Sequence, residues 1–297
     1  MVRNIGHINS RIKTMISLTK TNKVNRLERM SKMAKILMKW GGGLITDKGK
    51  LMSPKIQRMK KLSKMVKQLD DLGHSIIIVH GAGSFGHLKA KKWRLKEGRI
   101  ESIRNDQVKA VEEVRNDMRK LNQLVVNELE ILDMTTISHP PSNWAKGTGP
   151  EFTGSISEFR SNDESLITIT FGDVVNCDNP KDFGILSGDD IMVRLAKEIE
   201  DITHVIFLLG DAEGLLSSPP EDPDSELINL WKSGSILMGK HHSEIDVTGG
   251  IKLKVTSAEK ISEDIDHVWM IDGRKPERVI ELIQQGSTIG TKIVNEA

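Results

Sequence analysis

Cysteine and aromatic residues are scarce in this chain of 297 residues, and long apolar runs are missing. Cys177 is the single cysteine, so an intramolecular disulfide is excluded, and no histidine adjoins it in sequence to favour a nucleophilic thiolate. The chain contains no tyrosine, so no phenol group supports a site. No apolar segment approaches the roughly 20 residues that a membrane-spanning helix needs. These absences lead us to expect a cytoplasmic protein without a membrane partner.

A strong excess of charge is also missing. Lysine and arginine together number 43 and aspartate and glutamate 41, which gives a formal net charge of +2. This balance argues against a nucleic acid or an acidic protein as the partner. The chain is long enough to bury a large core in one or two domains. Length and composition therefore agree with an enzyme that acts on small molecules.

The first 33 residues differ in composition from the rest of the chain. They hold eight lysine or arginine residues and a single acid, Glu28, without a sustained apolar segment. This pattern predicts either a disordered basic extension or an incorrectly assigned start that precedes Met30 or Met33. The missing apolar core argues against a secretory signal, while a transit peptide stays open as an alternative.

From residue 34 onward, predicted strands alternate with predicted helices. Apolar residues at helical spacing predict helices at 56–72 and about 103–132, and the first of these feeds a predicted strand at 75–79. Further strands are expected at 134–138, 166–171, 204–209 and 267–271, and further helices at 188–200, 251–261 and 276–285. The alternation predicts an α/β fold, a three-layer αβα sandwich with a largely parallel central sheet.

The segment Val79-His-Gly-Ala-Gly-Ser-Phe-Gly-His87 carries the most information about function. An apolar strand ends there in a glycine-rich turn, and the turn is followed by a histidine. Gly81, Gly83 and Gly86 allow the backbone to approach an anion closely, and a loop that leads into a helix directs several N–H groups to one place. The segment predicts a phosphate site with His87 as a donor. A hydrogen-bonded structural histidine is the alternative.

A second unit of strand and glycines lies at Ile36-Leu-Met-Lys-Trp-Gly-Gly-Gly43. Lys39 interrupts the apolar strand just before the glycines, where its point charge suits a transferring phosphoryl group. Lys252 follows Gly249-Gly250 at a predicted helix start, where N–H groups and the helix dipole also favour phosphate. Because parallel sheets bind ligands at the carboxyl ends of their strands, the glycine turns after Lys39, after Val79 and after Phe171 are expected to converge along one edge.

Two further segments, Ile185-Leu-Ser-Gly-Asp-Asp-Ile191 and Asp246-Val-Thr-Gly-Gly-Ile-Lys252, complete a set of four. In order and spacing the set resembles the amino acid kinase superfamily, and most closely its archaeal-type isopentenyl phosphate kinases. The resemblance runs from about Ala34 to the C-terminus. Gly-Ser-Phe-Gly-His87 is its most discriminating part, because the family uses the histidine at that position to hold the phosphate of the acceptor.

The resemblance implies transfer of the γ-phosphoryl group of ATP to isopentenyl phosphate, which gives isopentenyl diphosphate and ADP. Mg²⁺ is expected on the nucleotide, without protein ligands of its own. The resemblance also implies that residues 34–178 bind the acceptor and residues 179–297 bind ATP. Pro180 and its Asp and Asn neighbours support a boundary there by their turn chemistry. Members of the superfamily commonly form dimers, so a homodimer is expected.

The same resemblance, together with the charges that phosphoryl transfer requires, predicts the site residues. The catalytic candidates are Lys39, His87, Asp189 and Lys252, with Asp189 at the family's acidic position that orients the lysines. The candidates for acceptor binding are Gly42, Gly81, Ala82, Gly83, Ser84, His87 and Gly172. The candidates for nucleotide binding are Lys39, Gly41, Gly43, Lys48, Gly83, Asp211, Gly214, Gly249, Gly250 and Lys252.

Two segments depart from the family pattern. Gly210-Asp-Ala-Glu-Gly214 stands where the family usually has Thr-Asp-Val-Asp-Gly, which leaves the contacts to the base open. Ala82 replaces a glycine of the phosphate loop, and we predict a negative φ at this residue because a side chain is strained at positive φ. A related kinase of a phosphonate such as fosfomycin, and a nucleotide-binding member of the fold without turnover, are the alternative functions.

The pocket for the organic part of the acceptor is the least defined feature. The long helix after His87 offers Val111, Val114 and Met118 as lining candidates. Each of these residues is equally explained by burial in the core, because apolar helical stripes usually face the core. Core and pocket both stay open at this point.

Overall fold

The computed structural model describes residues 33–160, 163, 165–219, 222–235 and 250–295. Residues 35–297 form one compact unit. The predictions for the basic extension, for Gly249 and for most of the segment 246–252 lie outside the described residues. No helix among the described residues is long and apolar enough to cross a membrane.

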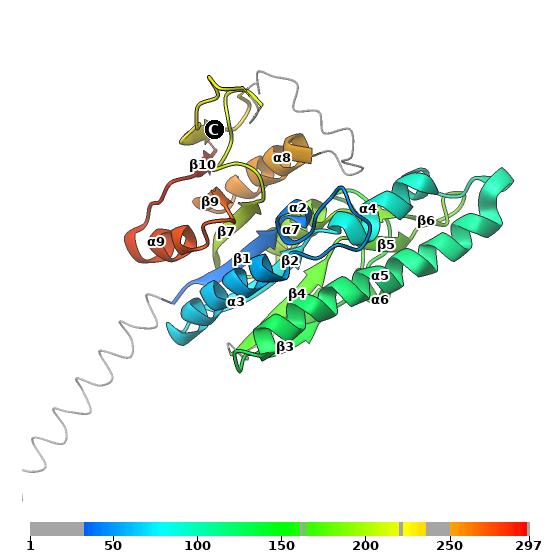
Figure 1. Ribbon diagram of the computed structural model, residues 1–297, viewed down its shortest axis with the longest axis horizontal. Helices are drawn as coiled ribbons and strands as arrows, with labels where there is room; N and C mark the ends of the chain where they lie inside the picture. The colour runs from blue at the N-terminus through cyan, green and yellow to red at the C-terminus, as the bar shows by residue number, and fades with distance from the viewer. Residues whose placement is uncertain (1–32, 161–162, 164, 220–221, 236–249, 296–297) are drawn as a thin grey trace, which may run out of the picture. The chain divides into compact units, whose positions relative to one another are not determined.

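The centre of this unit is a sheet whose eight described strands are mostly parallel (Figure 1). In spatial order they are β3 (Thr135–Ser138), β4 (Leu166–Phe171), β2 (Ser75–His80), β1 (Lys35–Trp40), β7 (Ile202–Leu209), β9 (His267–Asp272), β10 (Thr291–Val294) and β8 (Leu230–Lys232). β10 runs antiparallel to β9, and the other neighbours pair in parallel. A separate antiparallel pair consists of β5 (Asp173–Asn176) and β6 (Phe183–Leu186).

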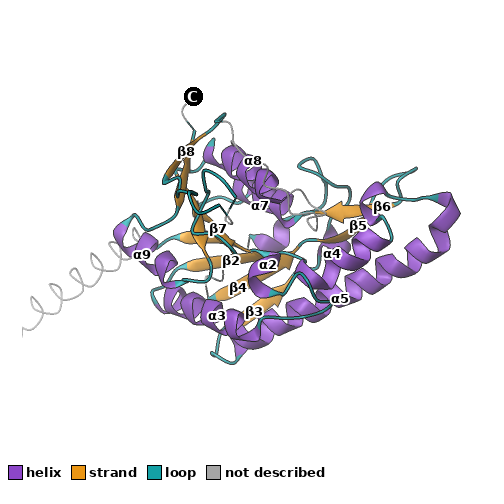
Figure 2. Cartoon of the chain, turned by 45° about the horizontal axis from the view of Figure 1, so that its top comes forward, coloured by secondary structure: helices purple, strands orange, loops and turns teal. Residues whose placement is uncertain are grey.

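Helices cover both faces of the large sheet (Figure 2). One face carries α3 (Ile56–Asp71), α5 (Arg104–Glu130) and α9 (Glu277–Gln285), and the other carries α7 (Gly188–Glu198) and α8 (Gly250–Ser262). Shorter elements are α2 (Gly42–Ile45), α4 (Gly83–Lys92), α6 (Pro141–Trp144) and 3₁₀ turns at Leu95–Glu97, Glu101–Ile103 and Ser157–Phe159. The predicted three-layer sandwich is confirmed.

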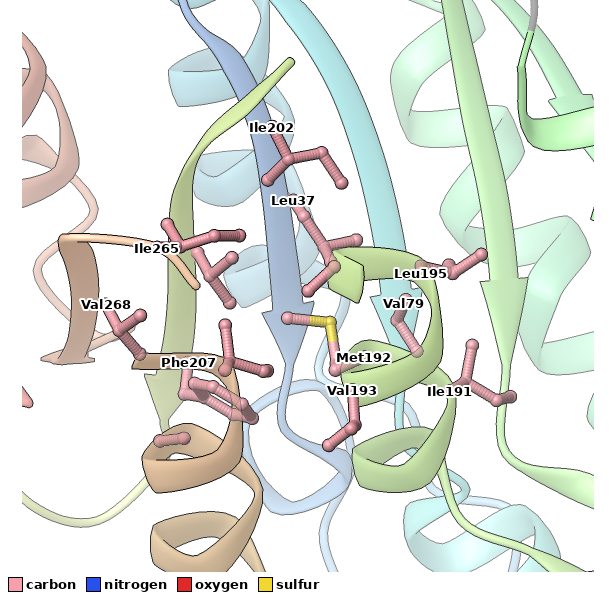
Figure 3. Packing of buried hydrophobic residues seen from close by; sticks show 14 of the residues in the cluster. Leu37, Val79, Ile191, Met192, Val193, Leu195, Ile202, Phe207, Ile265 and Val268 are labelled. Atoms are coloured by element: carbon pink, nitrogen blue, oxygen red, sulfur yellow. The ribbon is translucent and has the colours of Figure 1, made fainter. Parts of the chain in front are cut away.

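The central strands read as almost continuous apolar runs because both of their faces are buried. Leu37 of β1 and Val79 of β2 face α7, where Ile191 and Met192 pack with them in one cluster (Figure 3). All four side chains are fully buried. Such a core holds β1, β2 and α7 rigidly with respect to each other. β1 carries Lys39, α7 carries Asp189, and β2 leads into the turn at Gly81.

The helix α7 begins at a polar cap. Ser187 occupies the N-cap position with extended backbone, and its Oγ accepts a hydrogen bond from the Asp189 N–H at 3.1 Å. Asp189 and Asp190 follow in the first turn, where negative charge complements the helix dipole. Local sequence thus explains why a carboxylate stands at this end of the helix.

The predicted elements are found with boundaries that differ by a few residues, whereas several short ones were missed. The antiparallel pair β5 and β6 is the most important of these, because its strands have only four residues each. Short strands of this kind carry too few alternations to be distinguished from loops. The predicted boundary at 178/179 falls in the turn between them.

Candidate active site

Glycine turns after neighbouring parallel strands touch one another at one edge of the sheet. A Cβ atom added to Gly42 would lie 2.5 Å from the backbone N of Gly83, and one added to Gly81 would lie 2.6 Å from the N of Gly42. The turn after β4 is close to the start of α7, since a Cβ on Gly172 would lie 3.1 Å from the N of Gly188. The predicted convergence of the glycine turns is therefore present, and side chains would prevent it.

A cleft of about 990 Å³ opens at this edge. Most of the predicted site residues line it: Lys39, Gly41, Gly42, Gly43, Lys48, Gly81, Ala82, His87, Gly172, Asp189, Asp211, Gly214, Gly250 and Lys252. The structure thus gathers residues from both halves of the chain around one space.

Gly83 and Ser84 do not lie on the wall of this cleft. Ser84 is buried, its N–H donates to Thr46 Oγ1 at 2.9 Å, and its own Oγ accepts from the Ser53 N–H at 3.0 Å. Gly83 has a φ of +49°, and a Cβ there would lie 2.0 Å from Thr46 Oγ1. Both residues fasten the start of α4 to the segment after α2. Ala82 has a φ of −73°, so the predicted negative value is confirmed.

A buried ion pair lies in the wall of the cleft. The ammonium group of Lys39, whose side chain is 6% exposed, pairs with Oδ1 of Asp189, whose side chain is 2% exposed. Burial by itself raises the pKa of Asp189, but the charges of Lys39 and Lys254 outweigh it and hold the pKa below its ordinary value. Asp189 is therefore a fixed anion between lysines.

Lys254 is a residue that sequence reasoning missed. Its Nζ lies 3.9 Å from Oδ2 of Asp189 and donates to the carbonyl of Gly250 at 3.2 Å. Lys252, the predicted residue, is exposed and lines the cleft. Residues four positions apart on a helix lie on the same side, so Lys254 shares a side with Gly250 at the start of α8. Lys252, only two positions after Gly250, lies on another side. Helical spacing was the signal that favours Lys254.

His87 lines the cleft from α4, next to an apolar region. A Cβ on the preceding residue, Gly86, would lie 3.2 Å from the sulfur of Met118 on α5. The apolar lining of the cleft consists largely of Leu44, Ala90, Val114, Met118, Val174, Ile185, Leu186, Leu208, Leu209, Leu216 and Ile251. Val114 and Met118 therefore line the cleft as well as the core, while Val111 is buried without lining it.

Asp173 is a second residue that sequence reasoning missed. It lines the cleft at the start of β5, is only 3% exposed, and its Oδ1 accepts the Val174 N–H at 2.8 Å. Burial raises the pKa of Asp173 to about 6, although the Val174 and Ser142 hydrogen bonds and the charges of Arg115 and Arg119 work against the rise. This carboxyl group is held in an environment that disfavours its charge.

Lysines also surround the first glycine turn. The aliphatic part of Lys48 covers Gly43, since a Cβ there would lie 2.6 Å from Lys48 Cε. Lys55, which the sequence reading did not select, lines the cleft and donates from Nζ to the Gly43 carbonyl at 2.8 Å. Arg274, held by Asp272 at 2.8 Å, completes the cationic side. This part of the cleft suits a polyanion.

The described residues include no group of three or more histidine, cysteine, aspartate or glutamate side chains that could hold a metal ion. Lysines and glycine N–H groups, which bind phosphate, dominate the polar lining instead.

A doubly covered parallel sheet with glycine turns and buried lysine at its carboxyl edge defines a nucleotide-binding class of α/β protein. Residues 34–271 match the Amino acid kinase family, and the chain belongs to this family. It is 30% identical to the isopentenyl phosphate kinase of Thermoplasma acidophilum over 260 residues, 87% of this chain and 99% of that protein. The isopentenyl phosphate kinase of Methanocaldococcus jannaschii is 28% identical, covering 86% of this chain and 97% of its own.

Solved structures agree with this assignment. The product complex of the T. acidophilum isopentenyl phosphate kinase matches with a TM-score of 0.71 at 28% identity, over 88% of this chain and 100% of that chain. An isopentenyl phosphate kinase substrate complex matches with a TM-score of 0.73 at 26% identity over the same shares. Fold and sequence therefore point to the same branch of the family.

Proposed function

We propose that this protein is an ATP-dependent kinase of isopentenyl phosphate, which it converts to isopentenyl diphosphate with release of ADP. The observation that carries the proposal is the buried Lys39–Asp189 pair, which lines a cleft that has both cationic and apolar surface. Full-length similarity to isopentenyl phosphate kinases supports the same substrate class.

The centre of the cleft supplies the charge that phosphoryl transfer requires. The transferring group spreads negative charge over its equatorial oxygens, and Lys39 and Lys254 would bind these oxygens. Asp189 holds both ammonium groups in place, since it lies within ion-pair distance of each. The acceptor phosphate is already an anion at neutral pH, so transfer to it needs no general base. Asp189 is accordingly a positioning group.

The cationic part of the cleft is the proposed ATP site. The N–H groups of the Gly41–Gly43 turn and the side chains of Lys48 and Lys252 would bind the nucleotide phosphates. Asp211 and Gly214, which also line the cleft, are the candidates for contacts to the nucleoside. Mg²⁺ bound to the nucleotide would neutralise part of the phosphate charge, and Lys39 and Lys254 would share that task.

The apolar part of the cleft is the proposed acceptor site. His87 would donate to the phosphate of the acceptor, beside the backbone of Gly81, Ala82 and Gly172. A hydrocarbon chain would then occupy the apolar surface that includes Met118 and Val174. This surface favours isopentenyl phosphate over a small polar phosphonate such as fosfomycin. We keep the proposed two-lobe division, with the acceptor on 34–178 and ATP on 179–297, and add that the nucleotide phosphates also reach the Gly41–Gly43 turn and Lys48 of the first lobe.

A coupled assay of ADP release tests the proposal directly. The purified protein is given ATP and Mg²⁺ with isopentenyl phosphate, with fosfomycin, or without an acceptor. We expect ADP release that depends on isopentenyl phosphate, and isopentenyl diphosphate as the product by mass spectrometry. Equal ADP release with and without every acceptor would refute a kinase function, and release with fosfomycin alone would favour the phosphonate kinase.

The homodimer that the family resemblance implies is a separate proposal. Light scattering coupled to size-exclusion chromatography measures the mass in solution directly. A mass near twice that of the 33.2 kDa chain would support the dimer, and the mass of one chain would exclude it.

A further inference from the structure

The acceptor part of the cleft is bounded by two elements that are distant in sequence. Helix α5 contributes Val114 and Met118, and strand β5 contributes Asp173 and Val174. The two elements pack against each other, as Figure 1 also shows. β5 pairs with β6 in the small two-stranded sheet, and the central sheet reaches it through Gly172, whose N–H donates to the His80 carbonyl at 3.1 Å. Beyond this point the contacts of β5 with α5, α6 and β6 set its position.

Arg115 connects these two elements. It lies on α5 next to Val114, and its side chain is only 12% exposed. Its Nε–H donates to the Val174 carbonyl at 2.9 Å, and Nη2 donates to the Asn176 side-chain oxygen at 2.8 Å. Nη1 donates to Glu112 at 2.8 Å, which orients the guanidinium group from its own helix. One planar group thus holds two alternate residues of β5.

The contact to Val174 is the important one for the cleft. Val174 lines the acceptor part with its side chain while its carbonyl is held by Arg115. The guanidinium group offers several donors in a rigid plane, which a lysine ammonium group cannot reproduce. Arg115 therefore ties the backbone of Val174 directly to α5, the helix that carries Met118.

The charge of Arg115 acts on the same wall. Asp173, the residue before Val174, is buried in the cleft wall, and the guanidinium charges of Arg115 and Arg119 favour its ionised form. Arg119 itself donates to Ser142 Oγ at 3.2 Å. Both arginines thus support the start of β5 from α5, but only Arg115 binds the backbone of a residue that lines the cleft.

We propose that Arg115 is a positioning residue that sets the selectivity of the cleft for the size of the acceptor's hydrocarbon group. It does so by holding Val174 of β5 at a set distance from Met118 of α5. The inference rests on the proposed function, because it assumes that this part of the cleft binds a prenyl phosphate. Nothing in it requires Arg115 to touch the substrate.

The test compares Arg115→Met with Lys109→Met, which removes an exposed cation from the same helix. For each variant, kcat and KM are measured for ATP, for isopentenyl phosphate and for a ten-carbon prenyl monophosphate. We expect Arg115→Met to raise the KM for isopentenyl phosphate about tenfold, equivalent to about 1.4 kcal/mol. The KM for ATP should stay within about twofold of the wild-type value, and Lys109→Met should behave as the wild type.

The selectivity ratio is the readout that a general loss of structure would not produce. We expect the ratio of kcat/KM for isopentenyl phosphate to that for the ten-carbon acceptor to fall about fivefold or more in Arg115→Met. Arg115→Lys should recover only part of this ratio. An unchanged ratio, or an equal rise in KM for ATP and for the acceptor, would overturn the inference.

A second variant covers the case in which Arg115→Met does not fold, which thermal unfolding reveals. Asn176→Ala removes only the hydrogen bond from Arg115 Nη2 to the Asn176 side chain and leaves the one to the Val174 carbonyl. Asn176 lies at an exposed position of β5. It should shift the selectivity ratio in the same direction by about twofold. If the ratio stays constant in Asn176→Ala while Arg115→Met is unfolded, the inference fails. Wild-type protein without any turnover of isopentenyl phosphate would instead refute the proposed function itself.

Discussion

The two ends of the cleft obtain their binding properties in different ways. The cationic end uses glycine backbone and lysines that follow directly after β1 or lie close to it in sequence, such as Lys48 and Lys55. The apolar end is assembled from α4, α5 and the β5–β6 pair, which meet only after the chain has folded. The comparison shows that part of the proposed phosphate site is encoded locally, whereas Lys252, Lys254 and Arg274 and the whole proposed hydrocarbon site come from distant segments.

The largest expected effect is at the centre, where both ends meet. Lys39→Met should lower kcat about a thousandfold, because it removes a charge that binds the transferring group and leaves the Asp189 carboxylate buried without its close partner. Steady-state kinetics under saturating ATP and isopentenyl phosphate measure the loss. The control is Lys60→Met, which changes an exposed lysine on α3. A comparable loss of kcat in the control would show that the loss in Lys39→Met is not specific to the ion pair.

The next effect distinguishes the two lysines of α8. Lys254→Ala should lower kcat about a hundredfold, because Lys254 is the second cation near Asp189. Lys252→Ala should act mainly on the KM for ATP, about tenfold or less, since its exposed charge is screened by solvent. Measuring both kinetic constants for both variants decides between them. A larger kcat loss in Lys252→Ala would restore the role that sequence reasoning gave it.

A pH-dependent effect on stability is expected at the acceptor end. Because the pKa of Asp173 rises from 3.8 to about 6 on folding, the folded state binds this proton more tightly, and stability contributed by the group falls as pH rises from about 4 to 6. Asp173→Asn should therefore be nearly neutral at pH 4 and stabilise the protein by about 2 to 3 kcal/mol at pH 7. Urea unfolding at both pH values measures the difference.

The matched control for this prediction is Asp224→Asn, which changes an exposed carboxylate. It should leave the unfolding free energy equal to that of the wild type at each pH. A stability difference for Asp173→Asn that is the same at pH 4 and pH 7 would show that the carboxyl group titrates at its ordinary value in the folded protein.

The last effect concerns His87 and bears most directly on the contrast between the two ends. His87→Ala should cost about 2 kcal/mol in kcat/KM for isopentenyl phosphate, roughly thirtyfold, by loss of one charge-assisted hydrogen bond. Affinity for ATP, measured by calorimetry, should remain nearly unchanged. A loss of ATP affinity equal to the loss for the acceptor would show that His87 serves both ligands. It would contradict the assignment of His87 to the acceptor end alone.

Much of the site was predictable because its residues follow strands immediately. Lys39 lies near the end of β1, and Gly41–Gly43 and Gly81 follow directly after β1 and β2. The parallel arrangement alone brings such positions to one edge of the sheet. The negative φ of Ala82 was also predictable from sterics. Gly83 and Ser84, in contrast, contact Thr46. Thr46 lies at least 37 positions earlier in the chain, so no local sequence pattern predicts this contact.

The sequence by itself determined the fold class, the position of the glycine turns and the selection of Lys39, His87 and Asp189, all of which line the cleft. These properties follow from apolar periodicity and from local backbone chemistry, which act within a few residues. Only the tertiary structure decided that Lys254 joins Asp189, that Met118 lines the cleft and that Arg115 holds β5. These outcomes depend on which distant elements pack together, and burial and charge at such contacts have no counterpart in the local sequence.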